Sequence, residues 1–120
     1  MAVRLSRAIV LFVALAAFAC GASSEIQEIP SDALIVDVRS PGEYQAGHFP
    51  GAVNIPVDEI GGRLSDLGNK DAPIVVYCRS GNRSGRAKVM LEAAGFTHVA
   101  NGGALTTMMG LAPKPPSAEQ

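Results

Sequence analysis

Two short, uninterrupted apolar runs limit the folds open to this chain more than any other feature. Residues 33–38 read ALIVDV and residues 73–77 read PIVVY, and both are rich in β-branched side chains. Apolar runs of this length are typical of strands that are buried on both faces of a sheet. Such strands need helices above and below them. We therefore expect an α/β fold with a small, mostly parallel sheet flanked by helices on both faces.

The segments between these runs supply the remaining elements. Gly61 and Gly62 weaken one expected helix, and Gly95 is placed to end another in the left-handed conformation. In parallel sheets the working site lies beyond the carboxyl ends of the strands, which points to Asp37-Val38-Arg39 and to Cys78-Arg79. The expected elements are strands at 52–55 and 96–100, a helical turn at 43–46, and helices at 57–67, 83–94 and 104–111.

The first nineteen residues are expected to lie outside the fold. Arg4 and Arg7 precede an apolar run over residues 8–19, which is shorter than the roughly 20 residues that span a membrane. This pattern predicts a secretory signal and export to the periplasm. Cys20 follows the run and has two interpretations: a lipidated first residue that anchors the protein to the membrane, or an incidental free thiol next to an ordinary cleavage site.

The rest of the chain divides into three parts. Residues 20–32 are expected to form a tether and a first short element, residues 33–111 the domain, and residues 112–120 a proline-rich, disordered tail. Without residues 1–19 the chain has eight basic and eleven acidic residues, and it shows no basic stripe of the kind that nucleic-acid partners require. His48 and His98 stand alone, so we expect no metal site and no cofactor.

The segment after the second apolar run carries the chemistry. Cys78 ends a strand, and Gly81 allows the sharp turn into the next helix. The unpaired N–H groups of such a turn and of the first helical turn can bind an anion. Nearby Arg79, Arg83 and Arg86 oppose the helix dipole unless an anion offsets them. This setting favours the thiolate and predicts a pKa for Cys78 below the usual value of about 8.5.

Two other interpretations of Cys78 are weaker. A disulfide to Cys20 would use up the thiol, but Cys20 lies at a processing site, whereas Cys78 ends a strand inside a distinctive loop. An inert buried cysteine is common in cores, but it leaves the arginines and the glycine after Cys78 unexplained.

Three separated motifs resemble the rhodanese family, in its short, exported, single-domain bacterial form. The similarity extends from about Ile35 to Gly103, and departs from the family pattern by an abbreviated start and by the lack of a tryptophan after Gly103. The motifs are Asp37-Val38-Arg39 with Glu43-Tyr44 and residues 47–56, the loop Cys78-Arg79-Ser80-Gly81-Asn82-Arg83, and Gly95-Phe96 through Gly102-Gly103.

The resemblance implies a sulfurtransferase. Cys78 would take sulfane sulfur from thiosulfate or another small anionic donor, carry it as a persulfide, and pass it to cyanide or a thiol. Asp37 and Arg39 would support the loop, although a surface ion pair is an alternative for them. The resemblance assigns binding of the anion to the loop residues Arg79, Ser80, Gly81, Asn82 and Arg83.

Two rival functions remain open at this point. Cysteine phosphatases and arsenate reductases resemble this site, but they use a longer loop between cysteine and arginine than the four residues between Cys78 and Arg83. A persulfide carrier or docking module would keep both residues without turning over small substrates.

Overall fold

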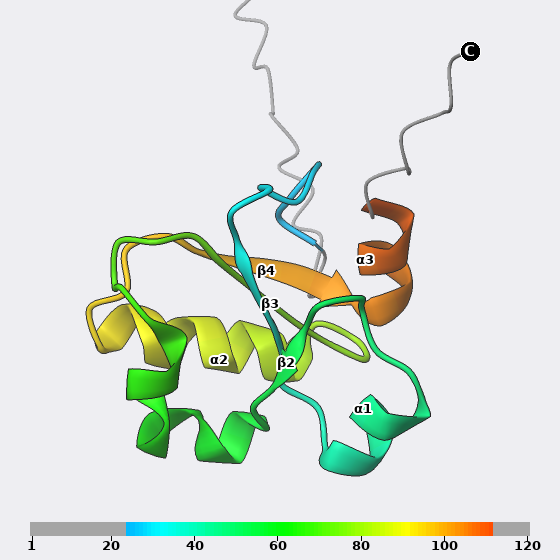
Figure 1. Cartoon of the computed structure of the whole chain (residues 1–120), viewed down its shortest axis with the longest axis horizontal. Coiled ribbons are helices and arrows are strands. Elements are labelled where there is room, and N and C mark those ends of the chain that lie inside the picture. The colour runs from blue at the N-terminus through cyan, green and yellow to red at the C-terminus, as the bar shows by residue number, and fades with distance from the viewer. Residues whose placement is uncertain (1–23, 112–120) are drawn as a thin grey trace, which may run out of the picture.

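The computed structural model describes residues 24–111, in which four strands form one sheet (Figure 1). The strand order is β2-β1-β3-β4, and all neighbouring strands run parallel. The expected α/β fold with a parallel sheet is therefore confirmed. The strands are β1 (Leu34–Asp37), β2 (Val53–Asn54), β3 (Ile74–Cys78) and β4 (Val99–Ala104).

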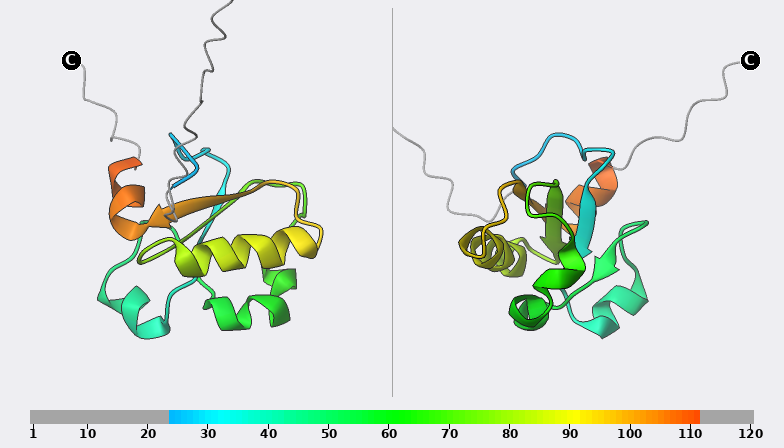
Figure 2. Two further views of the ribbon diagram at one scale, coloured as in Figure 1. Left: turned by 180° about the vertical axis from the view of Figure 1, so that it is seen from behind. Right: turned by 60° about the vertical axis from the view of Figure 1, so that its left-hand side comes forward.

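The central strand β3 divides the core into two halves. Val76 and Cys78 face one side, where they join a cluster with Leu91 of α2 (Asn82–Ala93). Tyr77 faces the other side and packs with Met108 of α3 (Leu105–Leu111). The two helices lie on opposite sides of the sheet (Figure 2), which explains why β3 is apolar on both faces.

The first helix is longer than the predicted turn at 43–46. Helix α1 spans Pro41–Ala46 and begins after Ser40. The Ser40 hydroxyl accepts from the Glu43 N–H, and the Glu43 carboxylate accepts from the Ser40 N–H, so the two residues form a capping box. Proline in the first turn costs the helix no hydrogen bond.

The helix predicted over 57–67 is wrong. This segment forms two 3-10 helices, η1 (Val57–Gly62) and η2 (Leu64–Leu67). Each glycine costs an α-helix about 1 kcal/mol relative to alanine, and the two adjacent glycines at the end of η1 interrupt it. Ile60 and Leu67 nevertheless remain buried in the cluster beside α2.

The strand predicted over 96–100 is misplaced. Gly95 adopts a φ of +98° and ends α2 as expected, but Phe96 donates its N–H to Leu91 O and completes the helix end. Strand β4 starts only at Val99 and continues through two glycines. Its pairing with β3 skips Gly102, which makes a bulge.

The segment before β1 lies against β4 without forming a helix or a strand over residues 24–32. Glu25 donates its N–H to Asn101 O at 3.0 Å, and Ile26 and Ile29 pack against the cluster beside α3. The expected signal, Cys20 and the expected tail lie outside the described residues. Within residues 24–111, no helix is long and apolar enough to span a membrane.

Candidate active site

Cys78 lies at the carboxyl end of β3, completely buried, and is a free cysteine. The chain turns back after it through Gly81, whose φ of +93° lies in the left-handed region that favours glycine. Helix α2 begins at the next residue, Asn82, without a side-chain cap. Gly81 has no side chain to cap the first N–H groups of α2, and the backbone of Ser84, in the first turn, instead bonds the Cys78 sulfur.

Hydrogen bonds from the loop converge on the Cys78 sulfur. The Gly81 N–H donates to Sγ at 2.9 Å, and the Ser84 hydroxyl lies 3.4 Å from it. Burial raises the pKa of the Cys78 thiol. Hydrogen bonds from Ser84 and from the backbone of Ser80 and Gly81 lower this pKa by more than burial raises it, so the pKa lies below its ordinary value. The direction predicted from the sequence is confirmed, and its cause is hydrogen bonding to the sulfur.

Arg83 is neutralised by Glu43, a pairing that was not predicted from the sequence. Its guanidinium makes two hydrogen bonds to the Glu43 carboxylate, at 2.7 and 3.0 Å. The conflict between Arg83 and the dipole of α2 is thus offset by a protein carboxylate, whereas the sequence argument assigned that part to a bound anion. The hydrogen bonds from Arg83, assisted by those from Ser40, lower the pKa of Glu43 to about 2.

The other loop side chains are more open. Arg79, Ser80 and Asn82 are exposed. Arg79 lines a hollow of about 280 Å³ together with Glu43 and Leu105. Among the described residues none forms an ion pair with Arg79, so its charge is available to an anion in this hollow.

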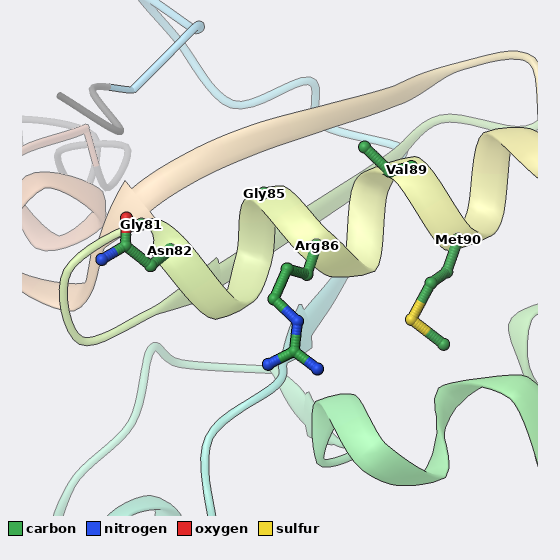
Figure 3. A pocket seen from close by; sticks show the side chains of 6 residues that line it. All are labelled: Gly81, Asn82, Gly85, Arg86, Val89 and Met90. Atoms are coloured by element: carbon green, nitrogen blue, oxygen red, sulfur yellow. The ribbon is translucent and has the colours of Figure 1, made fainter. Parts of the chain in front are cut away.

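Arg86 does not line the hollow that Arg79 lines. It lines a shallow hollow of about 500 Å³ that follows α2 from Gly81 to Met90. Figure 3 shows the Arg86 and Met90 side chains directed to one side of the helix and Val89 to the other. Arg86 is exposed and belongs to this outer face of α2.

Asp37 and Arg39 form a buried ion pair, so the alternative of a surface pair is wrong. Their side chains are 0% and 7% exposed, and the Arg39 guanidinium contacts the carboxylate at 2.6 Å. Arg39 also donates to Gly47 O at 2.7 Å. Tyr77 donates its hydroxyl to Asp37 at 2.7 Å and accepts the Phe49 N–H at 2.9 Å. This network joins β1, β3 and the segment after α1.

Two buried polar residues of this region were not predicted as site residues: Ser84, whose hydroxyl lies beside the sulfur, and Asn101, which bonds Ser84. Ser84 is completely buried on α2, and Asn101 is 5% exposed on β4. The Ser84 hydroxyl lies 2.7 Å from Asn101 Oδ1. A polar residue inside an otherwise apolar and small-residue strand was the available signal for Asn101. Within the described residues, no group of three His, Cys, Asp or Glu side chains could hold a metal ion.

Comparisons with known proteins agree with this geometry. The family described as "Rhodanese-like domain" matches residues 22–103. The thiosulfate sulfurtransferase PspE of Escherichia coli is 44% identical over 71 residues, which cover 58% of this chain and 68% of that protein. A sulfurtransferase of Allochromatium vinosum is 41% identical over 70 residues, covering 58% of this chain and 64% of that protein.

Solved structures show the same similarity. A rhodanese from E. coli, determined with anions, is 41% identical and superimposes with a TM-score of 0.60, covering 62% of this chain and 89% of that one. The chain therefore spans about two thirds of the length of the two curated relatives and most of this structural neighbour.

Proposed function

The chain belongs to the rhodanese-like domain family, and we propose that it is a sulfurtransferase that uses thiosulfate or a similar donor and forms a persulfide on Cys78. The observation that carries the proposal is the environment of Sγ: a buried sulfur that receives the Gly81 N–H at 2.9 Å and faces the Ser84 hydroxyl. Such donors favour the thiolate, which is the nucleophilic form.

The first half-reaction loads the enzyme. The Cys78 thiolate attacks the outer sulfur of thiosulfate, so that an Sγ–S bond forms while the bond to the sulfonate sulfur breaks. Sulfite leaves with that electron pair, and Cys78 carries a persulfide anion. Arg79, which is exposed and next to Cys78 in the chain, attracts the dianion and stabilises the charge on the leaving sulfite.

The second half-reaction unloads the enzyme. Cyanide or a thiolate attacks the outer sulfur of the persulfide, and the Sγ–S bond breaks. The electron pair returns to Sγ, which regenerates the thiolate, and thiocyanate or a new persulfide leaves. Because each half-reaction ends before the other begins, ping-pong kinetics are expected.

A thiosulfate–cyanide assay tests the proposal. The wild-type chain is expected to form thiocyanate, Cys78→Ser is expected to form none, and Cys20→Ser serves as the matched control with unchanged activity. Mass spectrometry after incubation with thiosulfate alone is expected to show one added sulfur, lost again on addition of cyanide. Substantial thiocyanate formation by Cys78→Ser would refute the assignment of the nucleophile.

The same preparation separates the rival functions. A stable persulfide with negligible thiocyanate formation would indicate a sulfur carrier. Hydrolysis of p-nitrophenyl phosphate without sulfur transfer would indicate a phosphatase, which the four-residue spacing between Cys78 and Arg83 disfavours.

We also propose export to the periplasm, on the basis of the charged and apolar pattern of residues 1–19. The intact mass of the protein from a fractionated bacterial host tests this. A mass that begins at Cys20 with added acyl chains would indicate a lipid anchor, a mass that begins at Cys20 without them would indicate simple cleavage, and an unprocessed cytoplasmic chain would refute export.

A further inference from the structure

The Ser84 hydroxyl faces two acceptors but has one proton to give. It lies 2.7 Å from Asn101 Oδ1 and 3.4 Å from Cys78 Sγ. All three side chains are buried, so no bulk water substitutes for either acceptor. A serine hydroxyl donates one hydrogen bond at a time and accepts others through its lone pairs. The position of this one proton therefore depends on which acceptor is stronger.

The orientation of the Asn101 amide is fixed by the backbone. The Gly103 N–H, which can only donate, lies 2.9 Å from Oδ1, and Gly81 O, which can only accept, lies 3.2 Å from Nδ2. These two contacts exclude the flipped amide. The carbonyl oxygen of Asn101 thus faces Ser84 and accepts from it.

We infer that Asn101 is a positioning residue that competes with the Cys78 sulfur for the proton of Ser84. While Cys78 is a thiol, its S–H donates to Ser84 Oγ, and Ser84 donates to Asn101. When the thiol loses its proton to solvent, the negative sulfur becomes the stronger acceptor. The Ser84 O–H bond then rotates toward Sγ, and no proton leaves Ser84.

The competition follows the charge of the sulfur through the proposed catalytic cycle, and to this extent the inference rests on the proposed function. In the persulfide the inner sulfur is neutral, so the hydroxyl turns back to Asn101. When the acceptor removes the outer sulfur, the electron pair returns to Sγ and the hydroxyl follows it. The two acceptors, Cys78 Sγ and Asn101 Oδ1, thus keep the buried Ser84 hydroxyl hydrogen-bonded in every state, which avoids the cost of an unsatisfied polar group.

The inference predicts opposite shifts for the two residues. Ser84→Ala removes the donor to the thiolate and is expected to raise the Cys78 pKa by about one unit, which is about a tenfold fall in the acid dissociation constant of the thiol. Asn101→Leu removes the competing acceptor, leaves the sulfur as the sole acceptor for Ser84, and is expected to lower the pKa by about half a unit. Although Asn101→Leu removes the bond from Nδ2 to Gly81 O, that oxygen still accepts the Gly85 N–H at 2.9 Å and is not left without a partner.

The experiment measures the rate of alkylation by iodoacetamide against pH for the full chain and four variants. These are Ser84→Ala, Asn101→Leu, the double variant, and Ser84→Thr, which keeps a hydroxyl and is expected to restore a midpoint near that of the wild type. Circular dichroism confirms folding of each, and Asn101→Ala replaces Asn101→Leu if leucine prevents folding.

The double variant decides between competition and a purely structural role. If Asn101 acts through Ser84, the downward shift caused by Asn101→Leu disappears in the Ser84→Ala background. An equal shift in both backgrounds, a raised midpoint in Asn101→Leu, or no shift at all would overturn the inference. The measurement uses no sulfur donor, so failure of the thiosulfate–cyanide assay would refute the proposed function without affecting this result.

Discussion

Arg83 of α2 and Glu43 of α1 form a two-bond ion pair, at 2.7 and 3.0 Å, beside the loop that carries Cys78. Each side chain is about one third exposed, at 33% and 30%. The pair lies between two hollows: Glu43 lines one together with Arg79, and Arg83 lines the other together with Asp58 and Glu59. An anion that uses Arg83 must therefore compete with Glu43.

The first prediction concerns donor binding. Glu43→Gln keeps the shape and an acceptor oxygen but removes the competing charge, so the KM for thiosulfate is expected to fall by a few-fold, with a smaller change in kcat. Sulfate is expected to inhibit this variant more strongly, and high salt to reduce both effects. Steady-state kinetics measure these changes, with Glu92→Gln on the exposed end of α2 as the charge-matched control. A higher KM in Glu43→Gln would show that Glu43 holds Arg83 in its binding position.

The second prediction concerns stability in acid. The ion pair lowers the pKa of Glu43 from 4.5 to about 2, so this carboxylate stabilises the folded state above pH 4.5 and loses that contribution as the pH falls toward 2. Thermal unfolding is expected to show a decline in Tm across this window that is shallower in Glu43→Gln. Identical declines in both proteins would contradict the prediction. Because both side chains are partly exposed, the effect is expected to be modest.

The third prediction concerns the network behind the loop. Burial raises the pKa of Tyr77, so its hydroxyl keeps its proton and bridges Asp37 and the Phe49 N–H. Tyr77→Phe leaves that buried N–H without its acceptor and is expected to cost about 1–3 kcal/mol in the free energy of unfolding. Tyr44→Phe removes a hydroxyl that donates to Ala52 O in a half-buried setting, and is expected to cost about 1 kcal/mol or less. Urea unfolding of both variants measures the two losses in the free energy of unfolding. Equal losses would contradict the prediction that the buried network contributes more than the half-buried hydrogen bond of Tyr44.

The fourth prediction concerns the bulge in β4. A Cβ at Gly102 would lie 3.0 Å from Val75 Cγ1 and still closer to Met108 Sδ. Gly102→Ala is therefore expected to destabilise the fold by about 1–3 kcal/mol through overpacking. Gly110, in α3, has nothing within 4 Å of such an atom, so Gly110→Ala is expected to stabilise the helix by up to about 1 kcal/mol. Denaturant midpoints that move in the same direction for both variants would contradict this account.

The residue types along the chain were enough to predict the layers of the fold and the place of Cys78 at a strand end. Strand β3 is apolar at every position because it is covered by α2 on one face and by α3 on the other, and such burial leaves a direct record in residue type. Gly81 and Gly95 likewise mark positions with φ of +93° and +98°, which other residues rarely adopt. The bounds of η1 and β4 were predicted less well, because adjacent glycines interrupt the segment after β2 and Phe96 still belongs to the end of α2.

The partners of Arg83 and of Ser84 could be found only from the folded chain. Glu43 and Arg83 are forty residues apart, and Ser84 and Asn101 seventeen, so no local spacing rule connects them. Whether an arginine faces a substrate or a carboxylate depends on how α1 packs beside α2. The residue pattern of the loop predicts the direction of the Cys78 pKa, but the contribution of the buried Ser84 hydroxyl depends on how α2 packs against β3.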